Sequence, residues 1–143
     1  MTYASLSDLI DRAGETEIRQ IADRDRDGVA DPGVIEAALE DADNLIDGYV
    51  AAKYATPLPS VPALVRTWAV SIARYVLHRN GAPEHVERDH KDAVSALKDV
   101  SRGAIALPVA PDEAAPTAVV GVTMARHPDP VFTPARLRGW RDA

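Results

Sequence analysis

Apolar residues recur every three or four positions through most of the first hundred residues, which is the spacing of amphipathic helices. The clearest run begins at Pro32, a residue suited to a first helical turn, and predicts one helix of about five turns. Its apolar positions are Ile35, Ala38, Leu39, Ala42, Leu45, Ile46, Tyr49 and Val50. The positions expected to face outward are acidic: Glu36, Glu40, Asp41, Asp43 and Asp47.

Two short helices are expected before this run. Ser5 or Ser7 can cap a helix that stops at Gly14, because serine accepts backbone hydrogen bonds at helix starts and glycine favours helix ends. A second helix fits residues 15–22, with Ile18 and Ile21 on one side.

Two longer helices follow a stiff connection. Three prolines between residues 56 and 64 predict extended chain. The next helix begins near Pro62 and ends at Asn80-Gly81, and another runs from Pro83 to Gly103. The apolar stripe of the first is Leu64, Val65, Trp68, Ala69, Ile72, Ala73 and Val76. The inward residues of the second are Val86, His90, Ala93, Val94, Leu97 and Val100.

The last forty residues have a different character. They hold six of the eleven prolines, and they contain a stretch at 118–126 that could form one short strand or hairpin. Phe132, Leu137 and Trp140, with Arg138 between them, are anchors that can lie on another chain or fold back on the protein's own helices. We therefore predict a mainly α protein with a bundle of about four to five helices. The helical domain spans 1–103 and an extended, proline-rich C-terminal arm spans 104–143.

Composition narrows the classes of protein that fit. The chain has 143 residues, the size of one domain, and no cysteine, which excludes disulfides, thiolate nucleophiles and cysteine zinc sites. The first fifteen residues turn polar too early for a signal peptide, and no run of about 18 apolar residues could span a membrane. We expect a soluble protein made in the cytosol.

Acidic charge is concentrated in the first third of the chain. The net charge is −6, and residues 8–47 hold 13 acidic and 4 basic side chains. Such a surface repels phosphate, so ordinary nucleic-acid binding is disfavoured. A solvated face that maintains solubility and the wall of a duct through which DNA slides both fit this pattern.

The stretch "ADRDRDGVADPGV" resembles part of a calcium-binding loop. In a twelve-residue loop of the EF-hand type, Asp23, Asp25 and Asp27 would occupy the first three ligand positions and Asp31 the ninth. The twelfth position, which should be a bidentate glutamate, is Val34, so any calcium site would be weak. The alternative is a tight turn in which the carboxylates accept backbone N–H bonds and Asp31 caps the long helix.

No catalytic constellation is recognisable. His85 and His90 are five residues apart, about 140° around a helix, and cannot share a metal, while His78 and His127 have no partner at a useful spacing. His90 lies on the apolar stripe and is expected to pack. Nucleophile elbows and phosphate-binding glycine loops are absent from the sequence. We expect a protein that is not an enzyme and needs no cofactor.

Several segments in order resemble the small head-to-tail connectors, or neck adaptors, of Mu-like phages and prophages. The resemblance rests on "SLSDLIDRAGETEIRQIADRDRDGVAD", "ALEDADNLIDGYVAAKYATPLPSVPALV", "IARYVLHRNG", "DAVSALKDVSRGAIAL" and "DPVFTPARLRGW". These segments cover almost the whole chain.

The resemblance implies a virion structural protein of the neck between head and tail, present in the host cytoplasm during assembly. Such adaptors form a homo-oligomeric ring, commonly a dodecamer, beneath the portal protein. They receive the next neck or tail protein, a stopper or tail terminator, and DNA passes through the centre without sequence-specific binding. A C-terminal extension that reaches the portal would match the arm, with Phe132, Leu137, Arg138 and Trp140 contacting the portal or a neighbouring copy. Two alternatives stay open: a calcium-responsive binding module, and an acidic DNA-mimic regulatory protein.

Overall fold

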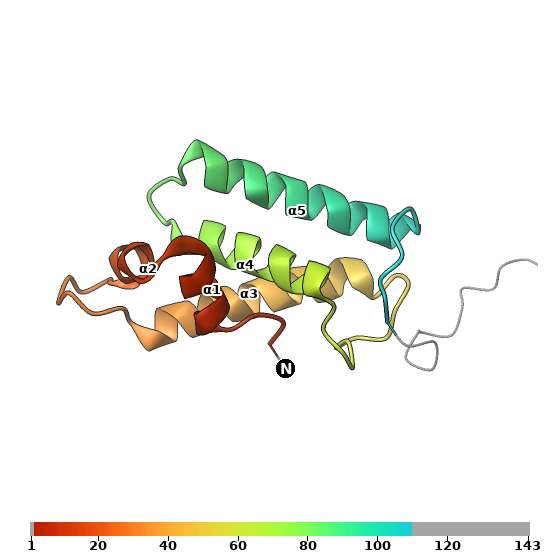
Figure 1. The fold of residues 1–143 in the computed structure, drawn as a ribbon, viewed down its shortest axis with the longest axis horizontal. Helices are drawn as coiled ribbons and strands as arrows, with labels where there is room; N and C mark the ends of the chain where they lie inside the picture. Colours follow the sequence, from red (N-terminus) through yellow and green to blue (C-terminus); the bar gives the residue numbers. More distant parts are fainter. Residues whose placement is uncertain (1, 110–143) are drawn as a thin grey trace, which may run out of the picture.

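The computed structural model describes residues 2–109, and in this range it contains five α-helices and no strand (Figure 1). The mainly α prediction is therefore confirmed. None of these helices is long and apolar enough to cross a membrane. The helices are α1 (Leu6–Ala13), α2 (Glu15–Ala22), α3 (Pro32–Val50), α4 (Ala63–Leu77) and α5 (Glu84–Arg102).

Helix α4 runs antiparallel to both α3 and α5, and the short α1–α2 pair packs at one end of these three long helices (Figure 1). Helix α4 is the central element, since it contacts α1, α3 and α5. Nine of its fifteen residues are buried. The single core that results is formed mainly by aliphatic residues of all the helices, with Trp68 as its largest side chain in α4.

The first turn of α1 is fixed by a capping box. The Ser5 hydroxyl accepts the Asp8 amide, and the Asp8 carboxylate accepts the Ser5 amide at 2.8 Å. The backbone hydrogen bond from Ser5 lowers the pKa of Asp8. A cap of this kind is worth about 1 kcal/mol. Gly14 then separates α1 from α2 with φ of +88°, a conformation that side-chain-bearing residues rarely adopt.

Helix α3 begins at Pro32, and Asp31 is its N-cap residue, as predicted. The side chain of Asp31, however, makes no hydrogen bond to the first turn; only its backbone carbonyl accepts the amides of Val34 and Ile35. Its Oδ2 atom instead accepts the Arg24 amide at 2.8 Å. Arg24 belongs to the loop between α2 and α3, so the Asp31 carboxylate stabilises this loop and does not cap the helix.

Helix α4 differs from its predicted stripe. Leu64 and Val76 are exposed, at 43% and 38%, while Val70 and Ser71 are buried. The reason is that neighbours pack on three sides of α4, so its buried face is wider than one stripe and is rotated from the predicted one. The helix also ends at Leu77, before the Asn80-Gly81 pair that was expected to stop it.

Two of the acidic residues expected to face outward on α3 do not. Asp43 is buried and accepts the Tyr3 amide at 2.9 Å, and Asp47 accepts the Tyr3 hydroxyl. Burial raises the pKa of Asp43 because desolvation disfavours the carboxylate. The Tyr3 hydroxyl also accepts the Leu58 amide, at 2.9 Å. These bonds fasten the N-terminal segment and the α3–α4 connection to α3.

Helix α5 ends at Gly103, as predicted, with the glycine in the left-handed conformation. The chain then returns to the bundle: Leu107 is buried, Ile105 and Val109 pack on the core, and the Leu107 amide donates to the Tyr54 hydroxyl at 2.8 Å. The first six residues of the predicted arm therefore lie on the helices.

The remainder of the predicted arm lies outside the described residues. This applies to the stretch 118–126 and to the predicted anchors Phe132, Leu137, Arg138 and Trp140. The division of the chain into a helical domain and an arm stays a prediction.

Candidate functional site

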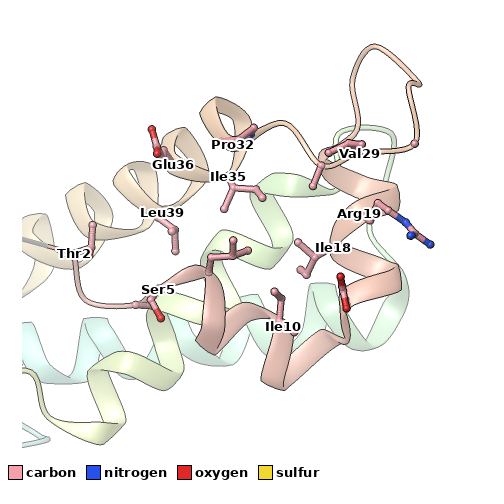
Figure 2. Close-up of a pocket in the computed structure, with 15 residues that line it drawn as sticks. Thr2, Ser5, Ile10, Ile18, Arg19, Val29, Pro32, Ile35, Glu36 and Leu39 are labelled. Carbon is pink, nitrogen blue, oxygen red and sulfur yellow. The ribbon is translucent and has the colours of Figure 1, made fainter.

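A groove with a volume of about 650 Å³ lies between the α1–α2 pair and the first half of α3. Figure 2 shows Ile10, Ile18, Ile35 and Leu39 directed into the groove from α1, α2 and α3. Ile18, Ile35 and Leu39 are core residues, so the floor of the groove is the surface of the core itself. This volume falls within the range of about 300–1,000 Å³ that is typical of binding pockets.

The rim of the groove exposes large apolar side chains. Leu6 of α1 is 42% exposed, and Val29 of the α2–α3 loop is 62% exposed. Both line the groove. Exposed apolar side chains that adjoin an apolar hollow form a continuous surface of the kind that partners cover. Figure 2 shows the charged lining residues Arg19 and Glu36 directed away from it.

Local sequence signals set the positions of the walls. The Ser5 capping box fixes the start of α1, and the Gly14 turn sends α2 back beside it. Pro32 starts α3 directly after the loop that carries Val29. The groove therefore combines three chain segments, each of which has a local reason for its shape.

The aspartate loop forms one edge of the groove, and its carboxylates accept backbone donors. Asp23 accepts the amides of Asp27 and Gly28, at 3.1 and 2.9 Å. Asp25 also accepts the Asp27 amide, and Asp27 accepts the Val29 amide at 2.8 Å. These are the contacts expected of the tight-turn alternative.

The same loop brings together three of the four candidate calcium ligands. Asp23, Asp25 and Asp27 each place a carboxylate oxygen within 4.8 Å of the others, while Asp31 is not in that group. The Asp27 amide favours the charged form of Asp25, but desolvation and repulsion by Asp27 and Asp31 raise the pKa of Asp25. Val34, at the position where a calcium loop needs a glutamate, packs against the core.

We expect chelation to leave the protein unchanged, because backbone amides already satisfy the loop carboxylates. Melting temperatures measured by circular dichroism with excess EDTA and with millimolar CaCl₂ should coincide. Asp25→Asn serves as a matched variant, since it removes one charge from the cluster. A calcium-induced rise in melting temperature that Asp25→Asn abolishes would establish the calcium alternative instead.

The structure also contains a cluster that the sequence did not predict. Arg74 of α4 donates to both carboxylate oxygens of Glu17 on α2, at 2.7 and 2.8 Å. His78 Nε2 lies 3.3 Å from Glu17 Oε1, and His85 Nε2 lies 3.4 Å from Arg74 Nη2. The hydrogen bond from Arg74 lowers the pKa of Glu17. This Arg74 cluster joins α2, α4 and the start of α5.

His90 behaves as the sequence predicts. Its ring stacks on Tyr75 with centroids 4.0 Å apart. Burial lowers the pKa of His90, because desolvation disfavours the protonated ring. His90 is therefore a packing residue in the interface between α4 and α5.

Comparison with known proteins gives the class of this protein. The Mu-like prophage FluMu protein gp36 of Haemophilus influenzae is 35% identical over 111 residues, which cover 78% of this chain and 79% of that protein. Gene product J of Escherichia phage Mu is 34% identical over 104 residues, which cover 72% of this chain and 74% of its own length. The fold and the groove thus belong to a protein of the Mu-like phage class.

Within that class the family is also defined. The family model described as Bacteriophage Mu, Gp36 matches residues 3–125, which include the five helices of the described residues and every residue that lines the groove except Thr2. The chain therefore belongs to the Bacteriophage Mu Gp36 family. The resemblance to Mu-like phage proteins that the sequence indicated is confirmed.

Proposed function

We propose that this protein is a structural head-to-tail connector of a Mu-like phage or phage-like particle. Copies of the chain form a ring, commonly of twelve subunits in the adaptors it resembles. The ring bridges the portal protein and the next neck or tail protein around the DNA channel. Its place is the virion neck, and its role is not enzymatic.

The observation that carries the proposal is an open apolar groove on a small helical domain, followed by a chain with large apolar side chains. The exposed residues Leu6 and Val29 support a role of the groove as a surface for another polypeptide. Phe132, Leu137 and Trp140 provide apolar groups that a ring can bury between subunits or against the portal. A chain that carries both an apolar groove and an apolar segment able to fill such a groove is suited to repeated assembly.

The charge of the helical domain supports a position beside DNA. Most acidic residues lie in α1, α2, the aspartate loop and α3. Negative potential on a channel wall keeps the phosphate backbone from adhering, so that the duplex can slide.

The contacts of the ionisable groups support a structural role. The Arg74 cluster joins helices, and the loop aspartates hold a turn. Asp43 fastens the N-terminal segment. Each of these groups is engaged in holding the fold together.

A stop codon after Val109, placed in a phage that encodes this chain, tests the proposal. This position keeps Ile105, Leu107 and Val109, which pack on the core, and removes the predicted anchors. We expect DNA-filled heads and separate tails in electron micrographs, with infectious titre restored by the full chain supplied in trans. A full-length chain with synonymous codons is the matched control.

Two outcomes would count against the proposal. Complete infectious particles in the absence of the whole protein would remove the connector role. Complete particles with the chain that ends at Val109 would remove the role of the anchors while leaving the connector role intact.

A further inference from the structure

The groove between α1, α2 and α3 has an apolar floor with acidic surroundings. Ile18, Ile35 and Leu39 form the floor, and the charged residues of the lining are Glu15, Glu36 and Arg19, which leave one net negative charge. The adjoining loop 23–31 adds four aspartates and two arginines. An occupant that fits this surface carries large apolar side chains and positive charge.

One segment of the chain outside the described residues has this composition. Residues 131–141, "VFTPARLRGWR", hold three apolar anchors and three arginines with no acidic residue. The anchors are Phe132, Leu137 and Trp140, and the arginines stand between and after them. Aromatic residues and arginine are the residue types that contribute most to binding energy at protein interfaces. The segment and the groove are therefore complementary in both polarity and charge.

The chain is long enough for this segment to reach the groove of a second copy. Val109 follows Leu107, which bonds to Tyr54 just beyond the C-terminal end of α3, whereas the groove lies at the N-terminal end of that helix. Helix α3, with 19 residues at about 1.5 Å each, separates the Leu107–Tyr54 bond from the groove by about 28 Å. Twenty-one residues, 110–130, separate Val109 from the segment, and a chain of this length could bridge up to about 65 Å at about 3.1 Å per residue. Prolines 111, 116, 128 and 130 stiffen this spacer, which favours reaching a neighbour over reversing onto the same bundle.

We propose that the groove binds residues 131–141 of a second copy of this chain. Each copy then gives one segment and accepts one, which is a heterologous contact that can close into a ring. The inference deepens the proposed function by naming the partner of the groove, and it rests on that function only for closure of the ring.

Binding of a peptide tests the contact directly. The receptor is the full chain carrying Phe132→Ser and Trp140→Ser, so that its own anchors are removed. A fluorescein-labelled peptide of residues 128–143 should bind it, as measured by fluorescence anisotropy. Val29→Asp in the receptor should weaken binding at least about tenfold, because it places a charge on the apolar rim. Val76→Asp on α4, at an exposed apolar residue away from the groove lining, is the matched control and should leave binding unchanged.

Complementation tests whether the contact joins two copies. The Val29→Asp chain keeps its C-terminal segment, and the Phe132→Ser, Trp140→Ser chain keeps its groove. Mixed together, they should form a heterodimer by sedimentation velocity, while each alone stays monomeric. A wild-type chain that stays monomeric and whose groove excludes the peptide would show occupation by its own segment and would overturn the proposal.

Other results would also overturn it. These are an absence of peptide binding, binding that Val29→Asp does not weaken, or a peptide that binds purified portal protein and not this chain. The test is separate from the connector test. If heads without tails form in the phage experiment but the peptide does not bind, the groove contact alone is refuted. If the peptide binds but complete particles form in the absence of the protein, the connector role alone is refuted.

Discussion

Replacing Glu17 by alanine should lower the free energy of unfolding by about 3 kcal/mol. The side chain of Arg74 is only 10% exposed and directs two hydrogen bonds at Glu17. Removal of the carboxylate leaves a buried guanidinium without its counter-charge, which costs about 3–5 kcal/mol in deeply buried pairs. Glu17 itself is partly exposed, so water compensates in part and the lower end of that range applies.

Urea denaturation at neutral pH measures this change. Glu87→Ala is the matched control, because Glu87 pairs with Lys91 on the exposed face of α5 and exposed pairs contribute little. Arg74 lowers the pKa of Glu17, so the contribution of the pair is present above the unfolded-state pKa near 4.5 and is lost as pH falls through the folded-state value. The loss caused by Glu17→Ala should therefore shrink on acidification. Equal effects of Glu17→Ala and Glu87→Ala would contradict the importance of the Arg74 cluster.

Replacing Tyr3 by phenylalanine should cost about 2 kcal/mol at neutral pH. Tyr3 is buried, and its hydroxyl donates to Asp47 while it accepts the amide of Leu58, a residue that is itself buried. Phenylalanine keeps the ring but leaves the Leu58 amide without this acceptor. An unsatisfied buried donor costs about 1–3 kcal/mol.

The same substitution should change the stability at high pH. Burial, followed by the hydrogen bond to Asp47, raises the pKa of Tyr3 to about 12, from 10.0 for an ordinary tyrosine. The folded state holds the proton more tightly, so this stabilisation is complete below pH 10 and is lost as pH rises toward 12. Urea midpoints at pH 8, 10 and 11 should fall more steeply for the wild type than for Tyr3→Phe. Tyr49→Phe, which also removes one hydroxyl, should follow the wild type; equal slopes for all three would contradict this account.

The five helices were predictable because the residues that start and end them act locally. Ser5 and Gly14 delimit α1, Pro32 starts α3 and Gly103 ends α5, and each of these residues acts through its own backbone or the adjacent turn. The prediction of which α4 residues are buried was less accurate. The exposure of Leu64 and the other outer residues depends on which helices pack around α4.

The buried polar contacts were not predictable in the same way. Arg74 and Glu17 are 57 positions apart, and no periodicity within either helix indicates the other. Asp43 did carry a usable signal, since it lies four residues after Leu39 and three before Ile46, both on the buried stripe. Its charge suggested an outward position, and only the Tyr3 amide, 40 positions away, explains why it can be buried.

In the candidate site too, local features were predictable from the sequence and tertiary ones were not. The turn formed by the loop aspartates follows from residues two to five positions apart, so the sequence indicated it. The groove depends on how the α1–α2 pair crosses α3, which is a tertiary relationship (Figure 2). Exposed Val29 in a polar loop was the one local sign of it.

Two tyrosine hydroxyls attach both ends of the described chain to the α3–α4 connection. Tyr3 is joined to Leu58, and Leu107 is joined to Tyr54, so both the entering and the departing chain are fastened near one short stretch. A pulling force applied to the chain beyond Val109 would be opposed by the packing of Val109 and by the Leu107–Tyr54 bond. Because Tyr54 belongs to the α3–α4 connection, such a force would act on the central helices without first separating α5 from them.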